Sequence, residues 1–493
     1  MEKLFRLLRD GLIIVLVTGV LLLAVELGLR WVYGAPGKVP PPQQIAYAFH
    51  PDYLIALKPG MEKRYIRSPQ NGGDTIYWRT NAAGFRGKEL LDDPELRVMV
   101  YGDSNIQGEF STLDSSYAGK LEYYLRAALQ REVEVINAGV IGFGPDQSLI
   151  RMTGEVARYR PDVVIFHVFA DNDFGDLIRN RLFEIDSAGA LVASPHPREA
   201  DPVLTTGTAS PFMLVEAAKR VGRKLLSARP AVHAEIFVER MRQRCQNEYA
   251  IYREGLPKSY SHFGDHYDFD LALEPDLPAS QEKVRLMGGV LKSAQAFAQQ
   301  QGFRLLVLIQ PSAIDVSENN YIAHFSLKKH AAYEPARLSD CVASLCDGAG
   351  IPYLNLYPIF LANNPNTLFF LIDDHWNDRG QGLAARETDG AGAASRSDRR
   401  GGALRRPVHF FLPTVSASLF AILPLCLKTQ ISYELISHPM PSGNSDRQPG
   451  AAFCSADRPL GGMAELPQSQ PQPDGCRKRR DRLYDHRRRH DGL

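Results

Sequence analysis

The chain has 493 residues, of which 44% are hydrophobic and 23% charged, and its 57 Lys and Arg residues nearly balance its 56 Asp and Glu residues. This is the composition of a globular protein and excludes disordered and fibrous classes, and the net charge of +1 argues against nucleic acid as a partner. The six cysteines are too few for a disulfide scaffold, and because no two form a CxxC pair we expect no metal site.

The first predicted element is a membrane-spanning helix within residues 1–34. Its uncharged stretch runs from Gly11 to Val25 and continues past Glu26 to about the length that a helix needs to cross hydrocarbon. Basic residues precede this stretch, which by the positive-inside rule places the N-terminus in the cytoplasm and the rest on the periplasmic or extracellular side. A cleaved signal peptide is the alternative. We favour an uncleaved anchor because no clear small-x-small site follows.

Residues 35–45 are rich in proline and predict a stiff spacer. From residue 46 to about 386, short β-branched runs alternate with helical stretches, a pattern typical of a parallel sheet wrapped by helices. The predicted strands are 97–101, 133–137, 162–169, 304–310 and 351–356. The predicted helices are 118–131, 146–159, 281–300 and 335–347. We therefore expect a three-layer α/β/α domain with a parallel, flavodoxin-like sheet of about five strands.

The segment at 174–278 is much longer than a usual strand-to-helix connection and predicts an inserted subdomain or lid, with a helix at 211–226. Within it, aromatic and acidic residues alternate from Tyr260 to Asp270. These residue types could stack on sugar rings and bind their hydroxyl groups. A loop that packs its rings onto the domain explains the same pattern, and we favour that interpretation.

Residues 387–493 are dominated by small residues, proline and arginine, and we expect most of this tail to be disordered. An apolar segment at 408–427 is a candidate second membrane span, although it contains two prolines. A further hypothesis is that the tail is not native, for example the product of a shifted reading frame. It rests on the helix that begins near Asp378, whose pattern is lost after Arg386.

A serine lies where the first predicted sheet strand ends. The strand at 97–101 runs directly into Gly102-Asp103-Ser104, and open α/β sheets carry their sites at this edge. A lone Gly-Asp-Ser tripeptide is more often an ordinary turn. Ser104 is therefore a candidate nucleophile only if the chain also supplies a base.

The candidate base is His375, near the end of the predicted domain and just before a short helix that Asn377 can cap. A neutral imidazole accepts a proton from serine near neutral pH, and a carboxylate on its other nitrogen fixes the tautomer. Asp373 can supply that carboxylate from the same loop. On its own, an Asp-x-His sequence is more often part of a surface loop.

Two further segments follow predicted strands and offer donors for an oxyanion. Gly142 lies in a glycine-rich turn after the strand at 133–137, where glycine lets a backbone N–H approach a ligand closely. Asn172 follows the strand at 162–169 and could donate its side-chain amide. Taken singly, a tight turn and a helix cap explain these two segments better.

Together the four segments, in this order, resemble the blocks of the SGNH/GDSL hydrolase superfamily over roughly residues 97–386. The preceding segment at 78–87 looks like the lead-in of membrane-anchored bacterial members. The resemblance implies a catalytic triad in which Ser104 is the nucleophile, His375 the base and Asp373 its partner.

The resemblance also implies an oxyanion hole, formed by the N–H groups of Ser104 and Gly142 and the side chain of Asn172. Two positions depart from the family pattern. Ala170 stands where the third block usually has glycine, and its methyl group could crowd the turn before Asn172. Asn105 follows the serine where an apolar residue is frequent.

We therefore expect a membrane-anchored, outward-facing serine esterase or O-acyltransferase that acts through an acyl-enzyme, with no cofactor and no metal. Its expected partner is an acylated, above all acetylated, glycan of the cell surface or an exported glycan, or a small ester. A non-catalytic binding or assembly factor in envelope polysaccharide export and a lipase on longer acyl chains are the alternatives. The oligomeric state stays open.

Overall fold

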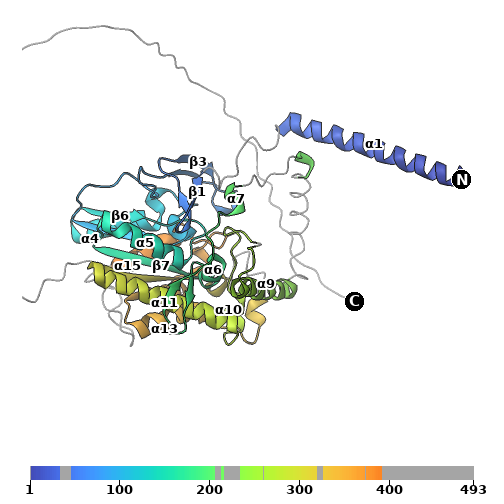
Figure 1. Ribbon diagram of the computed structural model, residues 1–493. Helices are drawn as coiled ribbons and strands as arrows, with labels where there is room; N and C mark the ends of the chain where they lie inside the picture. Colours follow the sequence, from blue (N-terminus) through green and yellow to red (C-terminus); the bar gives the residue numbers. More distant parts are fainter. Residues whose placement is uncertain are drawn as a thin grey trace, which may run out of the picture. The chain divides into compact units, whose positions relative to one another are not determined.

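The computed structural model describes residues 2–33, 46–205, 212–215, 234–258, 260–318, 326–371 and 373–390 (Figure 1). Three sequence predictions fall outside these residues. They are the spacer at 35–45, most of the helix expected at 211–226, and the tail beyond residue 390 with its apolar segment at 408–427.

Helix α1 (Glu2–Tyr33) contains the predicted membrane segment. From Arg9 to Val32 it is long and apolar enough to cross a membrane, with a mean hydropathy of 2.7, and its apolar side chains are exposed. A membrane anchor and a signal sequence share these properties. This helix therefore fits both alternatives.

A five-stranded sheet forms the centre of the domain, and all its strands are parallel in the order β11-β10-β7-β5-β6. The strands are β5 (Leu96–Tyr101), β6 (Val133–Asn137), β7 (Val163–Ala170), β10 (Arg304–Pro311) and β11 (Tyr353–Asn355). They confirm the five predicted strands to within two residues at each end. The order reverses between β5 and β7, and such a switch point opens a crevice beyond the carboxyl ends of the strands.

Helices cover both faces of the sheet because successive strand residues point to opposite sides. Met99 and Tyr101 of β5 pack in one apolar cluster, and Val98 and Val100 pack in another. The helices of the first cluster include α5 (Pro145–Tyr159), α11 (Pro278–Gln301) and α13 (Arg337–Ala349). Those of the second include α4 (Tyr117–Leu129), α14 (Tyr357–Leu361) and α15 (Asp378–Asp389). The three-layer fold is confirmed.

Helix α15 extends beyond Arg386, where the sequence pattern predicted its end. Asn377 caps its start by accepting hydrogen bonds from the N–H groups of Arg379 and Gly380, as predicted. At its other end Thr388 is buried and lies 3.0 Å from the Tyr117 hydroxyl of α4. Tertiary contact with α4 therefore holds the last turn although the apolar repeat has ended.

The long segment after β7 packs into the same core as the sheet. It forms α6 (Asp173–Asn180), β8 (Phe183–Ile185), β9 (Leu191–Ala193), α7 (Pro202–Thr205), α9 (Ala234–Glu254) and α10 (Phe269–Leu273). Val238 and Cys245 of α9 are buried in the first cluster together with Tyr267 and Phe269. Most of the described segment is therefore integral to the domain, and the rings of its aromatic stretch pack inward.

Two antiparallel ribbons precede the sheet. They pair β1 (Tyr47–His50) with β2 (Leu54–Leu57) and β3 (Glu62–Ile66) with β4 (Thr75–Arg79). Ile76 and Trp78 of β4 are buried in a third apolar cluster, whereas Tyr77 between them is exposed. The remaining short helices are η1 (Pro69–Asn71), α3 (Ser104–Gln107), η2 (Leu113–Ser115), α12 (Ala313–Val316), η4 (Ser326–Lys329) and η5 (Pro365–Thr367).

Candidate active site

Ser104 is the first residue of the short helix α3, directly beyond the end of β5. Asp103 caps this helix, because its carboxylate accepts a hydrogen bond from the Asn105 N–H at 2.9 Å. Ser104 is 8% exposed. The strand end and the cap together hold a largely buried hydroxyl group at the switch point of the sheet.

The loop before α15 brings His375 and Asp373 to Ser104. The His375 Nε2 lies 2.7 Å from the Ser104 Oγ, and its Nδ1 is hydrogen-bonded to the Asp373 carboxylate, which also accepts the His375 N–H at 3.0 Å. The indole of Trp376 donates to the carbonyl of Asn105 at 3.1 Å and ties the loop to α3. The structure therefore places the three predicted triad residues in hydrogen-bond contact.

Two opposing effects set the pKa of His375. Burial lowers the pKa, but the Asp373 charge and hydrogen bond, assisted by Asp374, outweigh burial and hold it well above its usual 6.5. The same pairing keeps the pKa of Asp373 below its usual value despite burial. In the neutral form of His375, the ionised Asp373 holds the single ring proton on Nδ1, and Nε2 is left to accept the Ser104 hydroxyl proton.

Asn105, one of the two departures from the family pattern, is the centre of a buried polar network. Its Oδ1 accepts from the Gln310 Nε2 of β10 at 3.0 Å, and its Nδ2 donates to Asp103 at 3.0 Å. The Gln310 Oε1 in turn lies 3.0 Å from the Nε2 of His167 on β7. An apolar residue could not join these strands to the helix of Ser104, so the departure is explained by local contacts.

The turn that contains Gly142 is held by two side chains. Gln107 accepts from the Ile141 N–H at 2.8 Å, and Asn137 accepts from the Gly139 N–H at 3.0 Å. Gly142 has φ +71°, a left-handed conformation that favours glycine. Among the described residues, no acceptor is bonded to the N–H of Gly142 or of Ser104. Both donors remain available to a ligand, whereas the N–H of Gly139 is engaged.

Asn172 follows β7, the neighbour of β5, but its side chain has a partner that the sequence did not indicate. The Nδ2 donates to the Asp265 carboxylate at 2.8 Å, and the Oδ1 is buried without a hydrogen-bond partner in the described part of the chain. Ala170 is fully buried at the end of β7. The structure thus adds Asp265, 93 residues away in sequence, to the surroundings of the predicted oxyanion donor.

Asp373, Asp374 and His375 lie close enough together to hold a metal ion. Both imidazole nitrogens of His375 are already engaged, Nδ1 with carboxylates and Nε2 with the Ser104 hydroxyl. A metal ligand on this ring would displace one of these contacts. The donor set therefore fits a proton-transfer chain better than a metal site.

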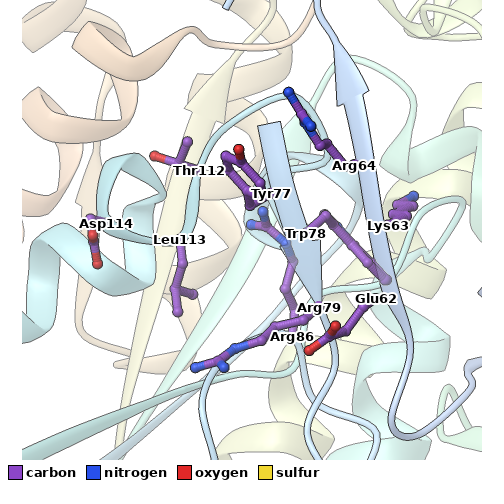
Figure 2. Close-up of a pocket in the computed structure, with 10 residues that line it drawn as sticks. All are labelled: Glu62, Lys63, Arg64, Tyr77, Trp78, Arg79, Arg86, Thr112, Leu113 and Asp114. Carbon is purple, nitrogen blue, oxygen red and sulfur yellow. The ribbon is translucent and has the colours of Figure 1, made fainter. Parts of the chain in front are cut away.

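A groove of about 770 Å³ lies along the β3–β4 ribbon (Figure 2). Its lining residues are Glu62, Lys63, Arg64, Tyr77, Trp78, Arg79, Arg86, Thr112, Leu113 and Asp114. The buried Arg86 donates its Nη1 to the carbonyl of Gln107, the last residue of α3, at 2.8 Å. Ser104 and His375 are not among its lining residues, and the Arg86–Gln107 hydrogen bond links the groove to α3.

We predict that histidine-selective NMR of the full-length protein in detergent micelles shows His375 titrating above pH 6.5. Substitution Asp373→Asn removes the charge that raises this pKa, so the midpoint should move to lower pH. Asp374→Asn should give a smaller shift in the same direction. An unchanged His375 midpoint in Asp373→Asn would contradict the described pairing.

Comparison with models of protein families finds no match, and comparison with curated proteins also finds none. Among solved structures, an acetyl xylan esterase, AlAXEase, is similar at 13% identity over 60% of this chain and 99% of its own, with a TM-score of 0.31. A lipase/acylhydrolase from Enterococcus faecalis is 13% identical over 60% and 96%, with a TM-score of 0.30. The psychrotrophic esterase EstA from Pseudoalteromonas sp. is 11% identical over 62% and 100%, with a TM-score of 0.29.

Proposed function

We propose that this protein is a serine esterase or O-acyltransferase that acts on acyl, chiefly acetyl, esters of a cell-surface or exported glycan. The observation that carries the proposal is the chain of hydrogen bonds from Asp373 through His375 to Ser104. A serine hydroxyl is a weak nucleophile, and an imidazole oriented by a carboxylate is the arrangement that activates it.

In the proposed mechanism, the Ser104 Oγ attacks the ester carbonyl carbon while the His375 Nε2 accepts the hydroxyl proton. The N–H groups of Ser104 and Gly142 and the amide of Asn172 stabilise the resulting oxyanion, each by on the order of 3 kcal/mol. His375 then donates its proton to the leaving alcohol, and Ser104 retains the acyl group. Water or a sugar hydroxyl attacks this acyl-enzyme, and His375 first accepts and then returns the proton.

The surroundings of Asn172 favour small or polar acyl groups over long alkyl chains. Asp265 is accessible to solvent and lies within hydrogen-bond distance of the amide proposed to bind the acyl oxygen. An alkyl chain passing this carboxylate would have to desolvate it without offering a partner in return. This contact supports the acetyl ester proposal over the lipase alternative.

The groove on the β3–β4 ribbon supports a polymeric substrate. The Tyr77 ring is 63% exposed, with the guanidinium of Arg64 5.5 Å from its centre. Arg79 follows two residues later on the same face of the ribbon, and neither arginine forms an ion pair within the described residues. An aromatic ring beside free guanidinium groups can stack on a sugar and bind its hydroxyl or carboxylate oxygens.

We also propose that α1 remains attached as an anchor. Lys3, Arg6 and Arg9 precede its apolar stretch, which favours a cytoplasmic N-terminus and an outward-facing catalytic domain. A site on that side of the membrane would meet cell-surface and exported glycans directly.

The first test is hydrolysis of p-nitrophenyl acetate by the full-length protein in detergent. We expect activity that falls by on the order of 10⁴-fold in Ser104→Ala and in His375→Ala, because the pair acts as one unit. Ser187→Ala, in the exposed turn between β8 and β9, is the matched control and should retain the activity. Equal rates in the wild type and in Ser104→Ala would exclude the serine mechanism.

The same preparation separates hydrolysis from transfer when an acylated donor and a polysaccharide acceptor are supplied together. Acylated polysaccharide formed without matching free acid identifies a transferase, and free acid alone identifies an esterase. A folded wild-type protein that produces neither would favour the non-catalytic binding factor.

If the groove binds a polysaccharide chain, its exposed aromatic ring should matter only for a polymeric substrate. Substitution Tyr77→Ala should lower kcat/KM for an O-acetylated polysaccharide about tenfold more than for p-nitrophenyl acetate, because a lost aromatic contact is worth about 1.4 kcal/mol. Tyr123→Ala removes a similarly exposed ring from α4 and should not discriminate between the two substrates. Equal effects of Tyr77→Ala on both substrates would exclude the groove as a binding site for the polysaccharide.

The anchor is tested by mass spectrometry of the mature protein expressed in bacteria. We expect peptides from residues 2–9 to be retained, and external protease to digest the catalytic domain in spheroplasts. A mature N-terminus near Ala35 would establish the signal peptide instead. Protection of the domain from protease would contradict its outward orientation.

A further inference from the structure

The loop at 260–268 is held firmly against the rest of the domain. The Tyr260 hydroxyl donates to the carbonyl of Arg179 at 3.1 Å, and the N–H of His262 donates to Asp201 at 2.6 Å. At the other end, the N–H of Asp268 donates to the carbonyl of Asp171 at 2.7 Å. These contacts join the loop to the residue after β7, to α6 and to the residue before α7, so the loop is tied down at both ends.

This loop touches two of the three donors that were predicted for the oxyanion, Gly142 and Asn172. A Cβ on Gly142 would lie 3.2 Å from the carbonyl oxygen of His262, so the loop packs tightly over the turn. Three residues later, Asp265 accepts the hydrogen bond from Asn172. One loop of the long segment after β7 thus forms a wall of the proposed oxyanion hole.

The donors and the acceptor on the Asn172 side chain show why its hydrogen bond to Asp265 matters for the orientation of the amide. A side-chain amide carries two N–H donors on Nδ2 and one acceptor oxygen. One N–H is given to Asp265, whereas the Oδ1 is buried with no partner among the described residues. No other side-chain contact described for Asn172 sets the orientation of its amide plane, and a rotated amide would direct its oxygen at the carboxylate.

We infer that Asp265 is a positioning residue for the proposed acyl transfer. Its carboxylate holds the amide of Asn172 so that the second N–H is free to bind the acyl oxygen. The inference rests on the proposed function and extends it to a residue outside the four family blocks. Asp265 itself does not contact the reacting atoms, so its effect on the reaction passes through Asn172.

The charge of Asp265 is separable from its role as an acceptor. The pKa of this carboxyl lies above its usual value although the residue is exposed, because the protein atoms around it hinder its solvation, and Asp374 and Asp103 oppose the lowering by Arg179 and His375. The group therefore lies in the same electrostatic environment as the triad. A negative charge beside a developing oxyanion opposes it, so the useful property of Asp265 is its acceptor oxygen. Asparagine has nearly the same shape and retains an acceptor oxygen without the charge.

The test measures kcat for p-nitrophenyl acetate in full-length variants. We expect Asp265→Leu to lose about 10- to 100-fold in kcat, because misplacing one oxyanion donor costs part of what removing it costs. Asp265→Asn should recover most of that loss. Asp276→Leu removes an exposed carboxylate near the end of α10 and serves as the matched control.

A double-mutant cycle separates positioning from a general structural role. In the Asn172→Ala background, Asp265→Leu should cause little further loss, because the group that it positions is absent. Additive losses, or failure of Asp265→Asn to recover activity, would overturn the inference while leaving the serine mechanism intact. If the wild-type protein shows no Ser104-dependent turnover, the proposed function and this inference both fall.

Discussion

The hydrogen bond between Ser104 and His375 is the contact on which the proposed serine chemistry depends. It joins residues 271 positions apart, one at the carboxyl end of β5 and the other in the loop before α15. A parallel sheet makes this meeting possible because all its strands open onto the same edge. The loop that carries His375 runs into α15, which packs with α4 in the second apolar cluster, so the packing of this cluster helps to place the histidine.

Polar side chains around α3 keep this contact in place. Asn105 connects the helix to β10 and to the histidine loop, while Gln107 holds the turn of Gly142. Each of these groups is buried, and removing one partner of a buried hydrogen bond costs about 1–3 kcal/mol. The network therefore couples Ser104, His375 and the turn of Gly142, because moving any one of them would break a buried hydrogen bond.

Much of this arrangement was predictable from the sequence, because the five strands are apolar runs and the triad residues stand at their ends or beside a capped helix. Gln107 was also within reach of prediction, since it lies nearly one helical turn from Ser104 and on the same side of α3. Asp265 was not, because no periodicity or spacing relates it to Asn172. The last turn of α15 could not be predicted either, because it depends on tertiary contact with α4 and lacks an apolar repeat of its own.

The most direct measurement is reaction of the full-length protein with a fluorophosphonate, followed by intact mass determination and peptide mapping. A serine activated by an imidazole attacks phosphorus, displaces fluoride and keeps the phosphonyl group, whereas ordinary hydroxyl groups do not react. We predict one adduct per chain, located on Ser104, and much slower labelling when His375 is replaced by alanine. No adduct on the folded protein, or an adduct on a different serine, would contradict this prediction.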